Sequence, residues 1–168
     1  FSVDLEALKN DDAAVVLANP NAPTGRALPR DEIVALVESN RDRLVVIDEA
    51  YFGFGAETAV PLVAGHDNLV VTRSLSKSHG LAGLRVGYAI AQAELIEGLN
   101  RVKDSFNSYP LDAVAQSAAT AAIEDRQWLE AASQSVRDVR EVMSTGLEAM
   151  GFEVLPSQAN FIFIQHNT

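Results

Sequence analysis

A lysine, two serines and an arginine lie close together in the stretch TRSLSKSHGLAGLRVGY. Ser74 and Ser76 offer hydroxyl groups and Arg85 offers a planar cation, a set that suits a phosphate monoester. Lys77 lies in the same short turn, and burial or a nearby positive charge helps a lysine amine to lose the proton that blocks Schiff-base formation. A solvated turn lysine is the ordinary alternative. The combination favours a small phosphate-bearing ligand that reacts with an amine.

An acidic residue and a tyrosine follow the apolar run RLVVID. Asp48 ends this run, so its carboxylate would lie at the rim of a core and need a partner, such as a protonated ring nitrogen. Tyr51 can reach the same pocket with its hydroxyl. Without such a ligand, Asp48 would be a helix cap and Tyr51 a packed aromatic residue.

Two loop motifs could present polar side chains to a ligand. NPNAPTG combines two prolines with Gly25 in a turn, and we expect Asn21 to point inward. FNSYPLD places Asn107 and Tyr109 before a proline-started helix, where they would be available to a substrate. A plain strand-to-helix turn and a capped helix entrance are the alternatives. No metal-ligand spacing links the histidines, so we assign no metal site.

The pattern of apolar residues predicts the elements that would position these side chains. Three runs that are apolar on both faces predict buried parallel strands over 13–18, 43–48 and 68–73, and a fourth run covers 85–91. Helical spacing or helix-start signals predict helices over 28–40, 93–105, 111–125 and about 127–150, before a strand pair over 152–156 and 160–164. In the first helix, Pro29 suits the first turn, and Ile33, Leu36 and Val37 make one apolar face.

Alternating strands and helices predict an α/β fold, a mostly parallel sheet with flanking helices, followed by a long helix that leads into the start of a small α+β domain. Ligands bind beyond the carboxyl ends of parallel strands. The motif that contains Asn21 follows the first strand, the one that contains Asp48 closes the second, and the one that contains Lys77 follows the third. We therefore expect them to meet at one edge of the sheet.

Composition limits the classes of partner. The chain has 168 residues and a net charge of −10, which disfavours a nucleic-acid or anionic-membrane surface. It has no cysteine, no apolar run that could span a membrane and no visible signal peptide, all consistent with a cytoplasmic location. There is no initiator methionine, and the sequence ends directly after a strand-like run. We therefore expect a piece of a longer chain.

Three motifs together, ANPNAPTG, VVIDEAYFGF and TRSLSKSHGLAGLRVGY, resemble fold-type I pyridoxal-phosphate enzymes of the class I/II aminotransferase family, in order and in approximate spacing. The resemblance covers nearly the whole chain. FNSYPLD and GFEVLPSQANFIF extend it to the subgroup that uses L-histidinol phosphate as amino donor. Many relatives have asparagine directly before Pro-Thr-Gly, whereas this chain has Ala22 there and Asn21 one place earlier.

The resemblance implies a role for each candidate residue. Lys77 would form the Schiff base with pyridoxal 5′-phosphate and later move the substrate proton. Asp48 would keep the pyridine nitrogen protonated, and Tyr51 would bind the phenolate oxygen. The phosphate would be held by Ser74, Ser76 and Arg85, Asn21 would contact the cofactor, and the substrate would lie near Asn107 and Tyr109.

The resemblance also implies a homodimer in which residues 1–125 are the central part of the large, cofactor-binding domain and 126–168 the connecting helix and the start of the small domain. The expected reaction is transamination between an amino-acid-like phosphate and 2-oxoglutarate, in histidine biosynthesis, with weak or no activity in an isolated fragment. Three alternatives remain: aromatic or aspartate transamination or threonine-phosphate decarboxylation; a non-catalytic phosphate-binding α/β module; and a piece that only packs and dimerises.

Overall fold

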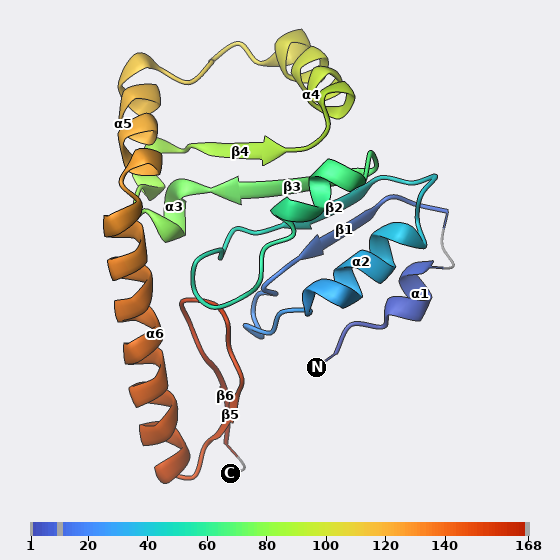
Figure 1. The fold of residues 1–168 in the computed structure, drawn as a ribbon. Helices are drawn as coiled ribbons and strands as arrows, with labels where there is room; N and C mark the ends of the chain where they lie inside the picture. The colour runs from blue at the N-terminus through green and yellow to red at the C-terminus, as the bar shows by residue number, and fades with distance from the viewer. Residues whose placement is uncertain (1, 10–11, 167–168) are drawn as a thin grey trace.

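A four-stranded sheet forms the centre of the molecule in the computed structural model, which describes residues 2–9 and 12–166 (Figure 1). The strands lie in the order β1 (Val15–Ala18), β2 (Val45–Asp48), β3 (Leu69–Ser74) and β4 (Gly87–Ile90). The first three are parallel, and β4 pairs antiparallel with β3. The predicted α/β fold with a mostly parallel sheet is confirmed.

One face of the sheet carries the main hydrophobic core. Side chains alternate between the two faces of a strand, and on this face β2 contributes Val45 and Ile47 to a cluster with α2 (Arg30–Glu38) and the 3-10 helix η1 (Val60–Gly65). The predicted apolar face of α2 is confirmed, because Ile33, Leu36 and Val37 are all fully buried. Pro29 is the N-cap residue of α2, one place before the first helical turn where we expected it. A short helix that the sequence pattern did not predict, α1 (Leu5–Lys9), packs against the same core.

The prediction that all three strands are buried on both faces is wrong for β1. Val16 points away from α2 and is 72% exposed. The cause is that no described residue covers this face of β1 at Val16. On β3, in contrast, the equivalent Val70 is 4% exposed.

The later helical segments follow β3 and β4 along the chain. The short helix α3 (Leu75–Ser78) and the 3-10 helix η2 (Ala82–Leu84) follow β3, and α4 (Ala93–Phe106), α5 (Ala113–Glu124) and α6 (Arg126–Ala149) follow β4, close to the predicted bounds. Asp112 caps α5 by accepting a hydrogen bond from the backbone of Ala115 at 2.8 Å. A second small cluster packs α5 against α3 and β4 through Leu75, Val86, Ala115 and Ala119.

Two arginines of α6 bind the loop that follows β2. Arg137 donates to the carbonyl oxygen of Gly53 at 2.7 Å, and Arg140 donates to that of Phe54 at 2.8 Å. The hairpin β5 (Glu153–Leu155) and β6 (Phe163–Gln165) then runs back beside α6 (Figure 1), as the predicted strand pair required. In the part of the chain that the structure describes, no helix is long and apolar enough to cross a membrane.

Candidate functional site

The three sequence motifs converge on the carboxyl edge of the parallel strands. Ala18 of β1 is opposite Asp48 of β2, and Asp48 is opposite Thr72 of β3. The segments that begin at Asn19, Glu49 and Leu75 therefore leave the sheet side by side. The predicted convergence is confirmed, and it follows from the shared register of the strands.

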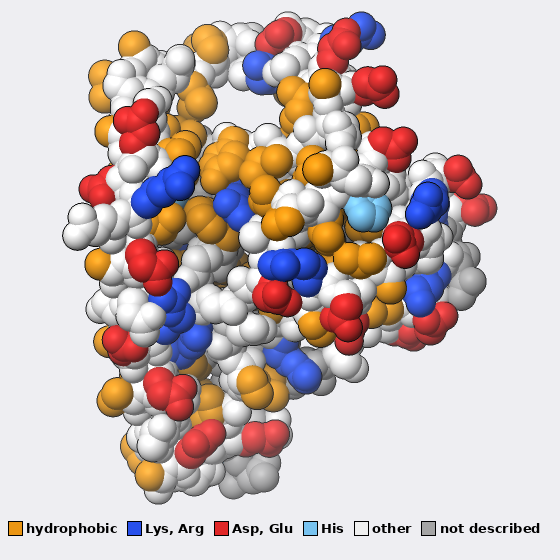
Figure 2. Space-filling view, in the orientation of Figure 1, with side chains coloured by type: hydrophobic (Ala, Val, Ile, Leu, Met, Phe, Trp, Pro, Cys, Tyr) orange, Lys and Arg blue, Asp and Glu red, His pale blue; other side chains and the backbone are white. Residues whose placement is uncertain are grey.

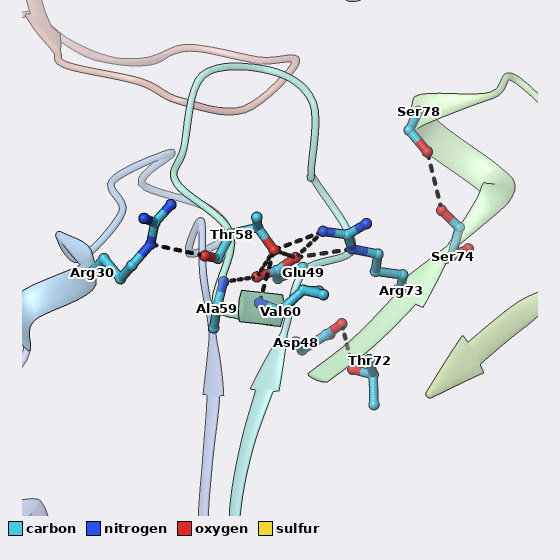
Figure 3. Close-up of polar contacts among 10 residues, drawn as sticks. All are labelled: Arg30, Asp48, Glu49, Thr58, Ala59, Val60, Thr72, Arg73, Ser74 and Ser78. Carbon is cyan, nitrogen blue, oxygen red and sulfur yellow. Dashed lines mark hydrogen bonds and ion pairs between the residues drawn. The ribbon is translucent and has the colours of Figure 1, made fainter. Parts of the chain in front are cut away.

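Asp48 lies at the end of β2 with a hydroxyl partner. The side chain of Thr72 donates to Asp48 Oδ1 at 3.0 Å across the β2–β3 pair (Figure 3). The carboxylate is only partly buried. The structure therefore gives Asp48 no helix-capping role, and its position leaves it open to a further partner.

The turn that contains Lys77 is the helix α3. Ser74 is its N-cap residue, and its Oγ accepts a hydrogen bond from the backbone of Ser76 at 3.1 Å. The two hydroxyl groups of Ser74 and Ser76 are 2.8 Å apart and hydrogen bonded. Lys77 itself is exposed. These contacts place two hydroxyl groups and one amine in a single turn of backbone directly after β3.

Arg85 follows the same segment in a rare backbone conformation. Its φ angle of 54° makes it the one non-glycine residue with positive φ among those described. A left-handed conformation costs about 1–2 kcal/mol for a residue with a Cβ. Such strained residues concentrate at functional sites. The exposed guanidinium donates to the carbonyl oxygen of Ala82 at 3.3 Å.

Tyr51 lies in the loop after β2 and is half-buried. Its ring packs edge-on against Phe161, with ring centroids 5.1 Å apart. Phe161 belongs to the segment between β5 and β6, and its contact with Tyr51 was not predicted from the sequence. The contact joins the end of the chain to the candidate site.

Asn21 is held inside its own turn. Its Oδ1 accepts a hydrogen bond from the Thr24 hydroxyl at 2.9 Å, and its carbonyl oxygen accepts one from the backbone of Gly25 at 2.8 Å. Gly25 has φ +74°, and a Cβ there would lie 2.3 Å from Ser157 Oγ, so the turn requires glycine. The side chain of Asn19 is more deeply buried, and its Oδ1 accepts a hydrogen bond from the backbone N–H of Leu28 at 2.7 Å.

Asn107 and Tyr109 are not brought to this edge. They lie in the connection from α4 to α5, which passes beyond β4 (Figure 1). Tyr109 is 90% exposed, and its backbone N–H donates to Asn107 Oδ1 at 3.3 Å. Within one copy of the described chain, these residues are therefore separate from the other candidates.

A buried carboxylate that the sequence reading missed lies next to Asp48. Glu49 is 1% exposed and accepts hydrogen bonds from the Thr58 hydroxyl, from the backbone of Ala59 at 2.6 Å and from Arg73 (Figure 3). Arg73 donates to Glu49 Oε2 from Nε at 2.9 Å and from Nη2 at 2.8 Å, and its Nη2 also donates to the Thr58 hydroxyl at 2.7 Å. The sequence signal that could have indicated Glu49 is its position as an acidic residue directly after an apolar strand.

One small cavity is lined by both members of this ion pair. It has a volume of about 130 Å³ and is lined by residues that include Asn19, Glu49, Phe52 and Arg73, but not by Lys77. A larger cavity of about 540 Å³ lies between α1, α2 and the turn that contains Asn21. Neither of these two cavities is lined by Asp48 or Lys77. At the sheet edge, Lys77 is exposed and Asp48 is partly exposed.

His79 is a buried histidine directly after α3. It is 6% exposed, its Nδ1 is hydrogen bonded to the Ser78 hydroxyl at 2.9 Å, and its ring lies 5.9 Å from that of Phe52. Burial lowers the pKa of His79 below its usual value, and the positive charge of Arg73 lowers it further.

This lowered pKa predicts a stability change in mild acid. The unfolded chain binds a proton on this imidazole at higher pH than the folded chain does, so folding loses stability as pH falls below about 6.5. The loss is at most about 1.4 kcal/mol per pH unit and stops below the folded-state pKa. Urea denaturation of wild type and His79→Phe from pH 8 to 5 measures it, since the variant keeps a ring against Phe52. Equal pH dependence in the two proteins would contradict the prediction.

Comparison with known proteins identifies the family. The model of the family described as aminotransferase class I and II matches residues 1–168. The chain belongs to this family. A curated relative among the aminotransferases, histidinol-phosphate aminotransferase 1 of Bradyrhizobium diazoefficiens, is 56% identical over 164 residues, which cover 98% of this chain and 47% of the relative. The chain spans about half the length of the curated relatives it matches.

Solved structures of an aminotransferase and of a decarboxylase share the fold. That of histidinol-phosphate aminotransferase from Sinorhizobium meliloti, in complex with pyridoxal-5′-phosphate, has a TM-score of 0.85 at 26% identity over 98% of this chain and 45% of that one. L-threonine-O-3-phosphate decarboxylase from Porphyromonas gingivalis has a TM-score of 0.75 at 27% identity over 95% of this chain and 52% of that one. The fold is therefore shared by enzymes that carry different names.

Proposed function

We propose that this chain is the central, cofactor-binding part of a pyridoxal-phosphate-dependent aminotransferase that transfers an amino group between L-histidinol phosphate and 2-oxoglutarate, in histidine biosynthesis. The observation that carries the proposal is the 56% identity to a histidinol-phosphate aminotransferase along 98% of the chain. The convergence of the Asp48 and Lys77 segments on one sheet edge supports it. We assign residues 1–125 to the large domain and 126–168 to the connecting helix and the start of the small domain.

The donor groups at the sheet edge fit the cofactor. Pyridoxal phosphate presents an aldehyde, a ring nitrogen and a phosphate. The edge offers an exposed amine at Lys77, a partly exposed carboxylate at Asp48, and the paired hydroxyl groups that begin α3. The exposed guanidinium of Arg85 adds a positive charge for the phosphate. Each group of the cofactor therefore has a partner of complementary chemistry.

Two residues carry the proton chemistry in this proposal. Asp48 would hold a proton on the ring nitrogen, since the hydrogen bond that its Oδ1 accepts from Thr72 at 3.0 Å orients the carboxylate. When bound, pyridoxal phosphate supplies an electron-withdrawing ring that stabilises negative charge on the substrate α-carbon. Lys77 would hold the cofactor through Nζ and would move the proton at the substrate α-carbon.

The remaining candidates bind and orient. Tyr51 donates its hydroxyl to the phenolate oxygen of the cofactor, and its edge contact with Phe161 limits the directions in which the ring can point. Ser74, Ser76 and Arg85 hold the phosphate. Asn21 is also assigned to the cofactor, through the part of its amide that Thr24 leaves available.

Arg85 provides a test of the phosphate site. The substitution Arg85→Gly removes a charged hydrogen-bond donor and should weaken binding of pyridoxal phosphate by about 10- to 100-fold. Glycine adopts φ 54° without penalty, so the unfolding free energy of the cofactor-free protein should stay the same or rise by about 1 kcal/mol. Fluorescence titration and urea denaturation measure the two effects. In the matched variant Arg85→Lys, the charge stays and the loss of affinity should be smaller; equal affinity in Arg85→Gly and wild type would contradict the role.

We assign Asn107 and Tyr109 to substrate binding in a homodimer. Their distance from the sheet edge within one copy supports a role toward a second copy, and α4 has no buried residue among those described. Its exposed apolar side chains include Val102, 60% exposed, and Phe106, 75% exposed. Figure 2 shows hydrophobic side chains around the opening beneath the connection from α4 to α5.

Sedimentation tests the dimer. It is done with the full chain, by which we mean the longer protein of which these 168 residues are the proposed central part. The double substitution of Val102 and Phe106 by lysine should raise the dimer dissociation constant by about 10-fold or more, because charge would be buried at the contact. The control is Asn100→Lys, on the same helix at an exposed polar position. Unchanged sedimentation of the double variant would exclude this face as the contact.

Borohydride trapping tests the proposed function. The full chain is incubated with pyridoxal 5′-phosphate, reduced with borohydride and mapped by peptide mass. We expect the reduced adduct mainly on Lys77, and its loss in Lys77→Ala but not in Lys103→Ala, which changes an exposed lysine of α4. Label spread over the lysines, or no label, would overturn the cofactor site.

The second candidate is decarboxylation, which the likeness to L-threonine-O-3-phosphate decarboxylase favours. Both reactions use the same lysine and aspartate, so the trapping experiment does not separate them. Product analysis does: we expect glutamate from 2-oxoglutarate with L-histidinol phosphate as donor. Carbon dioxide from L-threonine O-3-phosphate would support decarboxylation, and faster turnover of aspartate or an aromatic amino acid would support another transaminase.

A further inference from the structure

The ion pair between Glu49 and Arg73 lies on the opposite face of the sheet from the candidate cofactor residues. Side chains alternate along a strand, so Asp48 and Thr72 point to one face while their neighbours Glu49 and Arg73 point to the other, toward η1 (Figure 3). The pair therefore has no direct contact with a ligand bound at Asp48. Any effect of the pair on the reaction must act through other residues.

The carboxylate of Glu49 closes the loop that bears Tyr51. It accepts from the backbone of Ala59 at 2.6 Å and from the Thr58 hydroxyl, so the two ends of the loop are joined by one side chain. Arg73 binds both Glu49 and Thr58, which attaches the closed loop to β3. Tyr51 is thereby held in place relative to the strand that leads directly into α3.

An aromatic stack extends this connection to the helix that bears Lys77. The guanidinium carbon of Arg73 lies 4.1 Å from the ring centroid of Phe52, within the range of a cation–π contact. On the helix side, the ring of Phe52 lies 5.9 Å from that of His79, the C-cap residue of α3. One continuous set of contacts thus joins the loop of Tyr51 to both ends of the Lys77 segment.

We propose that Glu49 and Arg73 are positioning residues that hold Tyr51 and Lys77 in one relative arrangement for the reaction. The inference rests on the proposed function, and it assigns the pair a role beyond stability. A buried ion pair is a weak source of stability compared with apolar residues of similar volume. Its geometry, in contrast, is directional and links three segments of backbone at the candidate site.

The double substitution Glu49→Gln with Arg73→Met separates positioning from stability. Glutamine keeps an acceptor oxygen for Thr58 and Ala59, and methionine packs against the ring of Phe52. No uncompensated charge remains buried, so the full chain should fold. The matched control is Glu38→Gln with Arg41→Met, at an exposed ion pair whose atoms are 4.0 Å apart.

Three readouts report position rather than folding. In the cofactor-free protein, we expect amide hydrogen exchange in residues 50–57 and 75–79 to be about 10-fold faster or more, with unchanged exchange in β2. In the protein with bound pyridoxal phosphate, we expect the pH midpoint of the visible absorbance change to shift by about half a unit or more. We also expect kcat to fall about 10-fold, with KM changed less than about 3-fold. The conservative variant Arg73→Lys, with Glu49 unchanged, should show smaller changes in the absorbance midpoint and in kcat than the double variant does.

The outcomes are distinct. If exchange, absorbance midpoint and kcat of the folded double variant all equal those of wild type and of the exposed control, the positioning role is wrong. Failure of the wild type to form the Lys77 adduct overturns the proposed function instead. In that case faster exchange of both segments would still support the link between them, and unchanged exchange would overturn it.

Discussion

Replacing Lys77 by alanine is expected to lower kcat of the full chain by about 10⁴-fold. In the proposed function this residue is both the covalent anchor of the cofactor and the group that moves the α-carbon proton, and positioned acid–base groups contribute about 10²–10⁴-fold. The folded state should be preserved, because the Lys77 side chain is exposed and α3 is only four residues long. A steady-state assay with L-histidinol phosphate and 2-oxoglutarate measures kcat.

Chemical rescue provides a stricter test of the same residue. Added small amines should restore part of the proton transfer in Lys77→Ala, because the missing group is an amine in an open site. Lys103→Ala is the control for nonspecific loss of charge and should behave as wild type. A Lys77→Ala variant that retains more than about a tenth of wild-type kcat would contradict the assigned role.

Replacing Arg73 alone by alanine is expected to lower the unfolding free energy by about 3–5 kcal/mol. The substitution leaves the carboxylate of Glu49, 1% exposed, without its charged partner, and breaking a buried ion pair costs about this much. A domain has about 5–15 kcal/mol of stability in total, so the variant should be close to unfolding. Urea denaturation at neutral pH measures the change.

A second substitution checks the cause. Adding Glu49→Gln to Arg73→Ala removes the unpaired charge and should recover part of the lost stability, as the non-additivity of contacting residues requires. Arg41→Ala is the control, since the ion pair of Arg41 with Glu38 is exposed and its loss should cost about 0–1 kcal/mol. Equal losses in Arg73→Ala and Arg41→Ala would contradict the expected cost of leaving the Glu49 carboxylate without its charged partner.

Much of the fold follows from local patterns. The runs that became β1, β2 and β3 are short, apolar and followed by turn residues, and α2 carries Ile33, Leu36 and Val37 at helical spacing. These patterns predict the elements correctly because they depend only on residues that are close together in the sequence. The prediction that β1 is buried on both faces failed at Val16, because the exposure of this side chain depends on which distant segments cover that face of the strand.

The candidate site divides in the same way. Asp48 and Lys77 were predicted to lie at the sheet edge because Asp48 ends one strand and Lys77 comes shortly after another, and parallel strands end at one edge. Glu49 and Arg73 were missed, although Glu49 is adjacent to Asp48, because they are 24 residues apart and nothing local shows that they meet. Tyr51 and Phe161, whose rings are also in contact, are even further apart in the sequence.

The amino-acid sequence alone was sufficient for the family, the strand order along the chain and the chemical groups at the sheet edge, since these depend on residue type and local spacing. The three-dimensional arrangement was needed for the buried ion pair behind Asp48, the left-handed conformation of Arg85 and the separation of Asn107 and Tyr109 from the other candidates. The physical reason is that burial and pairing are properties of segments distant in sequence, and they exist only once the strands share a register.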